Sequence, residues 1–235
     1  MDFRKKFIVE PHVNFKLGNI DPSYKGTHES HESAAAELAL HTASLAQLQN
    51  RLYAEGKRSL LIVLQGLDAA GKDGVIRHVI SGTNPQGVNV ACFKQPTREE
   101  LAHDFLWRAH NHTPAKGEIM IFNRSYYEDV LIVRVHDIVP KSVWSKRYDR
   151  ICEFERLLVQ AGTHVIKILV RKSSSLDSKC GSMIRIGIGR SVIQIIPNAN
   201  TGQPISKLSK TPCSRRARRA HPGTLFRQTI SGFAI

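Results

Sequence analysis

The sequence predicts a three-layer α/β fold with a parallel sheet, and three observations carry this prediction. Short apolar runs alternate with helical segments from residue 32 onward, as expected for strands joined by crossover helices. A glycine-rich loop follows the first apolar run directly, and the alternation stops after Ile168. We therefore predict an N-terminal arm and helix over 1–56, a core over 57–168 that ends after about four strands, and an aberrant basic tail over 169–235 that is disordered.

The expected elements can be justified in chain order. The first helix has leucines at helical spacing, and the first strand is a continuous apolar run typical of a strand buried on both faces. Thr97 and Glu100 form a capping box that opens a later helix. Strands are expected at Ser59–Gln65, Val88–Phe93, Glu118–Phe122 and Thr163–Ile168, and helices at Glu32–Ala54, Gly74–Ile80, Thr97–His110 and Ser142–Gln160.

The net charge of +14 is concentrated at one end of the chain. Residues 170–235 hold 12 Lys and Arg against one acid, Asp177, a net charge of +11, whereas residues 1–169 hold 22 basic and 19 acidic groups, a net charge of +3. A polyanion-binding function therefore does not follow from the charge of the whole chain.

Membrane and secreted classes are disfavoured. No apolar run reaches the roughly 18 residues that a membrane helix needs, and the first residues lack the apolar stretch of a secretory signal. The four cysteines have no C-x-x-C spacing, so neither a zinc site nor a disulfide framework is indicated. We expect a reducing, cytoplasmic setting.

The most specific motif is the segment G-L-D-A-A-G-K-D-G at residues 66–74. It fits the phosphate-loop pattern G-x-x-x-x-G-K, in which backbone N–H groups and a helix N-terminus surround phosphate oxygens and the lysine neutralises their charge. Asp73 replaces the usual Ser or Thr that holds Mg²⁺, and Asp68 is the natural substitute. The alternative is a glycine turn without a ligand. The expected phosphate-binding residues here are Gly66, Ala69, Ala70, Gly71, Lys72, Asp73 and Gly74.

A second motif, N-R-S-Y-Y-E-D at residues 123–129, begins where another buried strand is expected to end. Arg124 can form two hydrogen bonds to phosphate oxygens, and Glu128 or Asp129 can support a metal ion or position Arg124. The alternative is a structural ion pair. Lys94 and Arg134 add positive charge near the same edge of the sheet and are further phosphate-binding candidates, although a solvated face is an equal alternative.

These motifs, together with their flanking segments, resemble the family-2 polyphosphate kinases over residues 1 to about 168. The resemblance implies a thymidylate-kinase-like P-loop kinase core that transfers phosphoryl groups between inorganic polyphosphate and nucleotides with Mg²⁺. It implies catalytic roles for Asp68, Lys72 and Arg124, a metal-binding role for Asp68 and Glu128, and a homo-oligomer in the intact family. The segments that carry it are Val9–Pro11, Asp21–Pro22, Ser59–Gly74, Asn84–Gly87, Phe93–Pro96, His103–Arg108, Phe122–Leu131 and Phe154–Leu158.

The tail departs from this family, whose members place basic residues on a helical lid after the fourth strand. Read one register over, with synonymous codons chosen freely, Leu169–Ser174 can encode I-S-K-E-E-Q, Ile195–Gly202 can encode D-Y-S-E-R-K-Y-W, and His221–Ile235 can encode A-P-W-Y-L-I-P-A-D-H-K-W-F-R-N. All three resemble the family's own C-terminal region in the right order. We infer a frameshift at about Ile168, and we expect poor folding and low activity in this chain.

Two other classes of function stay open. One is a generic P-loop nucleotide kinase that uses ATP as donor and does not respond to polyphosphate chain length. The other is a non-enzymatic polyanion-binding protein that acts through the basic segment at residues 207–219 of a real, divergent tail. The expected partners on the main interpretation are polyphosphate and a nucleotide, with neither a membrane nor a nucleic acid.

Overall fold

A computed structural model describes residues 7–8, 28, 31–66, 70–172 and 191–196. Its centre is a sheet in the order β2-β3-β1-β4-β5. The strands are β1 (Ser59–Gln65), β2 (Val88–Cys92), β3 (Ile119–Asn123), β4 (Thr163–Lys172) and β5 (Ser191–Ile196). The first four strands pair in parallel, whereas β5 pairs with β4 antiparallel.

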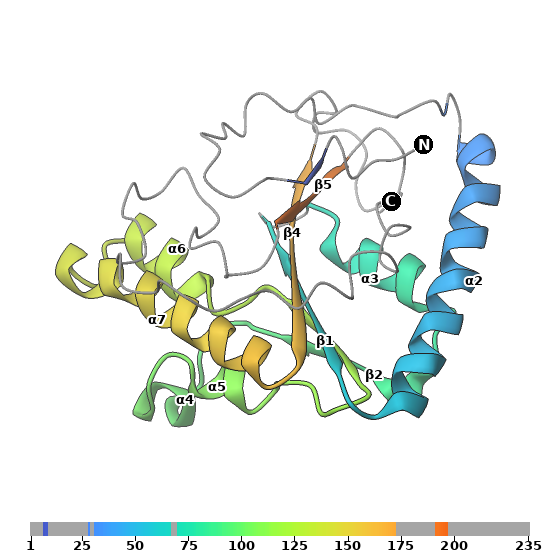
Figure 1. The fold of residues 1–235 in the computed structure, drawn as a ribbon. Coiled ribbons are helices and arrows are strands. Elements are labelled where there is room, and N and C mark those ends of the chain that lie inside the picture. The colour runs from blue at the N-terminus through green and yellow to red at the C-terminus, as the bar shows by residue number, and fades with distance from the viewer. Residues whose placement is uncertain (1–6, 9–27, 29–30, 67–69, 173–190, 197–235) are drawn as a thin grey trace.

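Helices cover both faces of the sheet, which gives the three layers (Figure 1). On one side lie α2 (His31–Glu55) and α3 (Lys72–Ile80), and on the other α6 (Glu128–Val135) and α7 (Lys141–Gln160). The short helices are η2 (Pro85–Gly87), α4 (Arg98–Ala102) and α5 (Trp107–His110). The predicted three-layer α/β fold with four parallel strands is confirmed.

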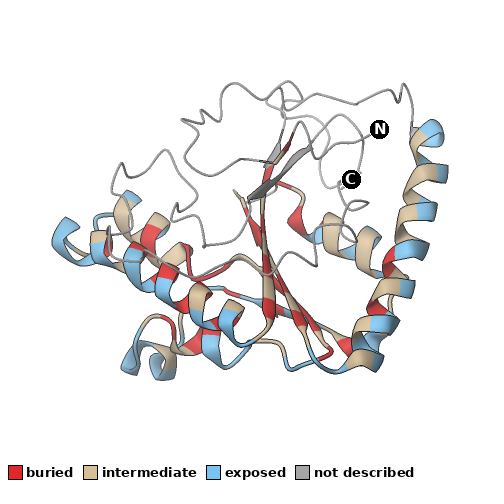
Figure 2. Ribbon diagram, viewed as in Figure 1, coloured by how far each residue is buried: buried red, intermediate tan, exposed pale blue. Residues whose placement is uncertain are grey.

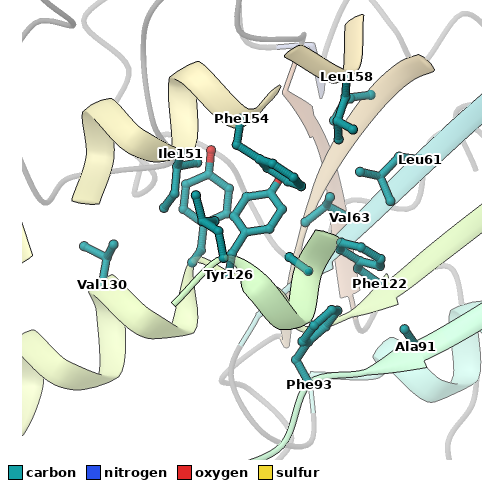
Figure 3. Close-up of a cluster of buried hydrophobic side chains, with 14 of the residues drawn as sticks. Leu61, Val63, Ala91, Phe93, Phe122, Tyr126, Val130, Ile151, Phe154 and Leu158 are labelled. Atoms are coloured by element: carbon teal, nitrogen blue, oxygen red, sulfur yellow. The ribbon is translucent and has the colours of Figure 1, made fainter. Parts of the chain in front are cut away.

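Two hydrophobic clusters join these layers. The larger packs α6 and α7 against the sheet and is rich in aromatic side chains; in Figure 3, Tyr126 lies among Phe122, Ile151 and Phe154. The smaller consists of aliphatic side chains between the sheet and the α2/α3 layer; Ile121 of the sheet is one of its buried members, and Val75 of α3 packs against the cluster. Buried positions accordingly run along the central strands and the inner sides of the helices (Figure 2).

The structure corrects the single helix expected over Thr97–His110. The capping box of Thr97 and Glu100 is present, but α4 ends at Ala102 and α5 begins at Trp107. In the gap, the Asp104 carboxylate accepts a hydrogen bond from the Leu106 backbone N–H at 2.9 Å. This side-chain bond competes with the helical backbone pattern and accounts for the break.

The core extends beyond the boundary expected at Ile168. β4 continues to Lys172, and β5 (Ser191–Ile196) pairs with it, so the sheet includes residues beyond Ile168. Without β5, β4 would be an edge strand with unpaired backbone groups, and a β-branched run is well suited to pair with it. The rest of the tail lies outside the described residues.

Candidate active site

Both sequence motifs lie at the edge of the sheet where the parallel strands end. Leu64 of β1 and Cys92 of β2 each stand beside Asn123, the last residue of β3. The loops that follow β1 and β3 therefore meet at the carboxyl edge, the place where open α/β sheets bind their ligands.

Two glycines of the first motif are required by the local backbone. A Cβ atom on Gly66 would lie 2.3 Å from the Val170 carbonyl oxygen of β4, so a larger residue would push the loop away from the sheet. Gly71 precedes α3 with φ of 101°, a conformation that L side chains rarely adopt. Ala70 is buried beside this turn. Asp68 and Ala69 lie outside the described residues.

Lys72 lies over its own loop. The side chain is only 7% exposed, and its Nζ donates a hydrogen bond to the Gly66 carbonyl oxygen at 2.8 Å. The lysine is the first residue of α3, so its charge and the N-terminal dipole of the helix act at the same point. This arrangement favours an anion at the loop.

Asp73 connects the first motif to the second. Its Oδ1 accepts a hydrogen bond from the Asn123 side-chain amide at 2.6 Å. In many P-loop enzymes a Ser or Thr follows the loop lysine and a second strand supplies an Asp for the metal ion. In this chain a carboxylate, Asp73, follows the lysine, and the end of β3 carries the amide of Asn123.

Gln65 makes a second connection between the motifs. Its amide nitrogen donates to Glu128 Oε1 at 2.6 Å, and its amide oxygen accepts from the Ser125 hydroxyl at 3.1 Å. Gln65 is the last residue of β1 and is buried. Glu128 is thereby held at the start of α6, close to the strand that leads into the phosphate loop.

Arg124 occupies an unusual backbone conformation directly after β3. Its φ is 63°, a left-handed value that is uncommon for a bulky residue and that concentrates at functional sites. Its backbone N–H donates to the Leu64 carbonyl oxygen at 2.9 Å. The turn at Arg124 is therefore tied to β1, next to the phosphate loop.

Lys94 and Asp129 are linked through Arg108. The Arg108 guanidinium donates to the Lys94 carbonyl oxygen at 2.8 Å and to Asp129 Oδ2 at 2.9 Å. Burial raises the pKa of the Asp129 carboxyl, and the charge of Arg108 opposes that rise. This partly buried pair holds the segment after β2 against α6, while the Lys94 side chain remains exposed.

Arg134 lies in the last turn of α6, away from the start of the helix where Glu128 lies. Its guanidinium carbon is 5.0 Å from the centroid of the Trp144 ring on α7. This contact joins two helices of one layer, and the phosphate-binding role of Arg134 stays a prediction.

Among the described residues, no group of three or more His, Cys, Asp or Glu side chains forms a metal site. Mg²⁺ commonly binds one or two carboxylates together with substrate phosphates and water, so such a group is not required. Mg²⁺ prefers oxygen donors, and two carboxylates of the site supply them. Asp73 is hydrogen-bonded to Asn123, and Glu128 is hydrogen-bonded to Gln65. The residues present therefore fit a divalent cation.

Sequence reasoning missed several residues of this site. The sequence analysis did not name three residues as candidates. Gln65 and Asn123 are placed by their positions at the ends of β1 and β3, and Arg108 by its ion pair with Asp129. A signal for the first two existed, because a polar residue that ends an apolar strand lies at the ligand-binding edge.

Comparisons with known proteins agree on one family. Residues 28–178 match the model of the family described as Polyphosphate kinase 2 (PPK2). The chain is 51% identical over 170 residues to an AMP/ADP-polyphosphate phosphotransferase of Meiothermus ruber, covering 72% of this chain and 64% of the relative. It is 45% identical over 191 residues to an ADP-polyphosphate phosphotransferase of Rhodopseudomonas palustris, covering 74% and 65%.

A solved structure agrees with the sequence comparisons. The crystal structure of Polyphosphate Kinase 2 from Arthrobacter aurescens TC1 superposes with a TM-score of 0.62 at 42% identity, covering 65% of this chain and 56% of that one. The chain thus spans less than two thirds of the length of these relatives. On the strength of the family match and the shared fold, the chain belongs to the polyphosphate kinase 2 family.

Proposed function

We propose that this protein is a phosphotransferase that moves phosphoryl groups between inorganic polyphosphate and nucleoside mono- or diphosphates. The observation that carries the proposal is the phosphate loop between β1 and α3, joined through the Asp73–Asn123 hydrogen bond to the second motif. Relatives with these substrates in their names, AMP/ADP-polyphosphate and ADP-polyphosphate phosphotransferases, support it.

The chemistry asks for positioning and charge neutralisation rather than covalent catalysis. Backbone N–H groups at the start of α3 and the Lys72 ammonium group would hold the transferring phosphoryl group. Arg124, held in its turn by the Leu64 carbonyl, would stabilise the charge that spreads over the equatorial oxygens. Two observations support these roles: the hydrogen bond of Lys72 Nζ to the Gly66 carbonyl oxygen, and the backbone hydrogen bond that ties Arg124 to β1.

A divalent cation, which we expect to be Mg²⁺, would be held by Asp68 and Glu128 together with substrate phosphates. When bound it would neutralise charge on the phosphate oxygens. The fit rests on Glu128, one of whose carboxylate oxygens is bonded to Gln65 while the carboxylate faces the strand that leads into the loop. The carboxylate of Asp73 is positioned by its hydrogen bond from Asn123 at the end of β3.

The basic tail bears on how active this chain is. If the frame changes at about codon 168, the family's basic lid is missing, and a positively charged lid residue can contribute roughly 10³–10⁵ in rate in related systems. We expect turnover by this chain to be about 10³-fold or more below that of a version with the frame restored. Sequencing codons 160–235 in the source genome tests the frame directly, and an unchanged frame there removes this explanation.

The donor experiment tests the function itself. Both versions of the protein are incubated with Mg²⁺, AMP or ADP, and either polyphosphate or ATP, and the nucleotide products are separated by chromatography. We expect products from polyphosphate, lost in Lys72→Ala and unchanged in Lys57→Ala, a surface lysine outside the site. Transfer from ATP alone, with no response to polyphosphate chain length, would instead identify a generic nucleotide kinase.

A further inference from the structure

A buried ion pair lies behind the second motif. Glu155 of α7 and Lys167 of β4 are 2.8 Å apart, and each side chain is only 1% exposed. Removing two charges from water is costly, and such pairs are weak contributors to stability compared with apolar packing. We therefore expect these two residues to have a role other than stabilising the fold.

The partners of Glu155 indicate what that role is. Glu155 Oε1 accepts hydrogen bonds from the Tyr126 hydroxyl at 3.0 Å and from the Tyr127 hydroxyl at 2.9 Å, while Oε2 accepts from Lys167. Both tyrosines are almost fully buried. One carboxylate thus anchors two consecutive side chains, and its other oxygen is paired with the ammonium group of Lys167.

In the sequence, the anchored tyrosines lie between two charged residues of the candidate active site, Arg124 and Glu128. Arg124 precedes them and carries the left-handed backbone, and Glu128 follows them and is bonded to Gln65. The segment 124–128 is therefore tied to β1 through Arg124 and Glu128, and to α7 through the bonds of its two tyrosines to Glu155. A left-handed backbone is unfavourable for a non-glycine residue and persists only where its surroundings hold it.

We propose that Glu155, supported by Lys167, is a positioning residue that holds the turn at Arg124 in its binding conformation through Tyr126 and Tyr127. The effect on phosphate binding rests on the proposed function, whereas the effect on the turn does not. Glu155 does not touch the phosphate loop in any of the contacts described above, so its action passes through the two tyrosines.

The first test measures the turn without any ligand. Hydrogen–deuterium exchange of a peptide covering residues 122–130 is compared between the unaltered chain, Glu155→Gln and Glu153→Gln. Glu153 is the matched control because it lies on the same helix and pairs with Arg150 at 3.0 Å, but is exposed. We expect exchange in this peptide to be about tenfold faster in Glu155→Gln, with the 72–80 peptide unchanged, and no change in Glu153→Gln.

The second test measures binding of tripolyphosphate with Mg²⁺ by calorimetry in a double-mutant cycle. Glu155→Gln should weaken binding about tenfold in the unaltered chain and less than about twofold when Arg124 is already alanine. Equal losses in both backgrounds would show a general structural effect and overturn the proposal. If neither the unaltered chain nor the version with the frame restored binds tripolyphosphate, the proposed function fails, and the exchange experiment still decides the positioning role.

A variant with a smaller change guards against misfolding. If Glu155→Gln does not fold, Tyr127→Phe removes one of the two hydroxyl anchors and keeps the ring packing. Faster exchange over residues 122–130 in Tyr127→Phe supports the proposal. Exchange at the level of the unaltered chain in a folded Glu155→Gln or Tyr127→Phe protein would overturn it.

Discussion

The two faces of the sheet are covered by different types of side chain. The face covered by α6 and α7 is aromatic and contains the buried Glu155–Lys167 pair. The face covered by α2 and α3 is aliphatic, with Leu64, Ile119 and Ile121 at its centre. Figure 2 shows that both are buried along the central strands.

This difference corresponds to what each face supports. The aliphatic face backs α3, whose start is already shaped by the backbone of the phosphate loop, including Gly71. The aromatic face backs the segment that follows Arg124, where Tyr126 and Tyr127 are held by directional hydrogen bonds to Glu155. Directional contacts orient side chains in a way that non-directional apolar packing does not.

The largest effect should come from breaking the ion pair on the aromatic face. Glu155→Leu leaves the Lys167 ammonium group buried without its carboxylate, which should cost about 3–5 kcal/mol of unfolding free energy. Urea denaturation measures this loss, and Glu153→Leu on the exposed side of the same helix should stay within about 0.5 kcal/mol. A cost below about 1 kcal/mol, the range of exposed pairs, would contradict a buried pair.

A smaller effect is expected from shortening a side chain on the aliphatic face. Ile121 is 1% exposed, and Ile121→Val should cost about 0.5–1.5 kcal/mol by removing one buried methyl group. Tripolyphosphate affinity should not change, because this face does not hold the turn at Arg124. A tenfold loss of affinity at this modest cost in stability would remove the distinction between the faces.

The two faces should also differ at opposite ends of the pH scale. On the aromatic face, burial and then the charge of Glu155 raise the pKa of Tyr127 well above 10.0. A raised folded-state pKa gives stability that is present below the unfolded value and is lost as the pH rises above it. Tyr127→Phe should therefore reduce the loss of stability above pH 10.0, measured by urea denaturation; an unchanged alkaline profile would contradict this account.

His164 should make the stability depend on pH at the acid end of the scale. Its effect on the free energy of unfolding is the smallest that we expect. Burial, and then the charge of Arg58, lowers the pKa of His164 below its ordinary value of 6.5. A lowered folded-state pKa gives stability that is present above 6.5 and lost as the pH falls through the folded value. His164→Gln should flatten the stability profile on the acid side, and a profile as steep as that of the unaltered chain would refute the assignment.

Much of the fold was predictable because periodicity and loop chemistry are local. The four parallel strands and the capping box at Thr97 follow from patterns within a few residues. Helix α6 was missed because its eight residues, Glu128–Val135, follow the second motif without a side-chain cap. The break between α4 and α5 depends on one hydrogen bond of the Asp104 side chain. The spacing of apolar residues in the sequence does not reveal such a bond.

The candidate site was predictable in part. Gly66, Gly71 and Lys72 belong to one short motif, but the contacts between motifs join residues far apart in the sequence: Asp73 and Asn123 are 50 positions apart. Glu155 was the hardest to anticipate, although it falls in the buried stripe of α7 with Ile151 and Leu158. A charged residue at an apolar position of a helix was the available signal.

The most direct test of the central claim asks where this chain binds phosphate chains. Tripolyphosphate affinity with Mg²⁺ is measured by calorimetry for the unaltered chain, for Lys72→Ala, and for a variant with all four arginines of Ser214–Arg219 changed to alanine. We predict a loss of about tenfold or more in Lys72→Ala and a smaller loss in the arginine variant. Affinity that survives Lys72→Ala and disappears with the four arginines would contradict a phosphate-loop function and make this chain a polyanion binder through its tail.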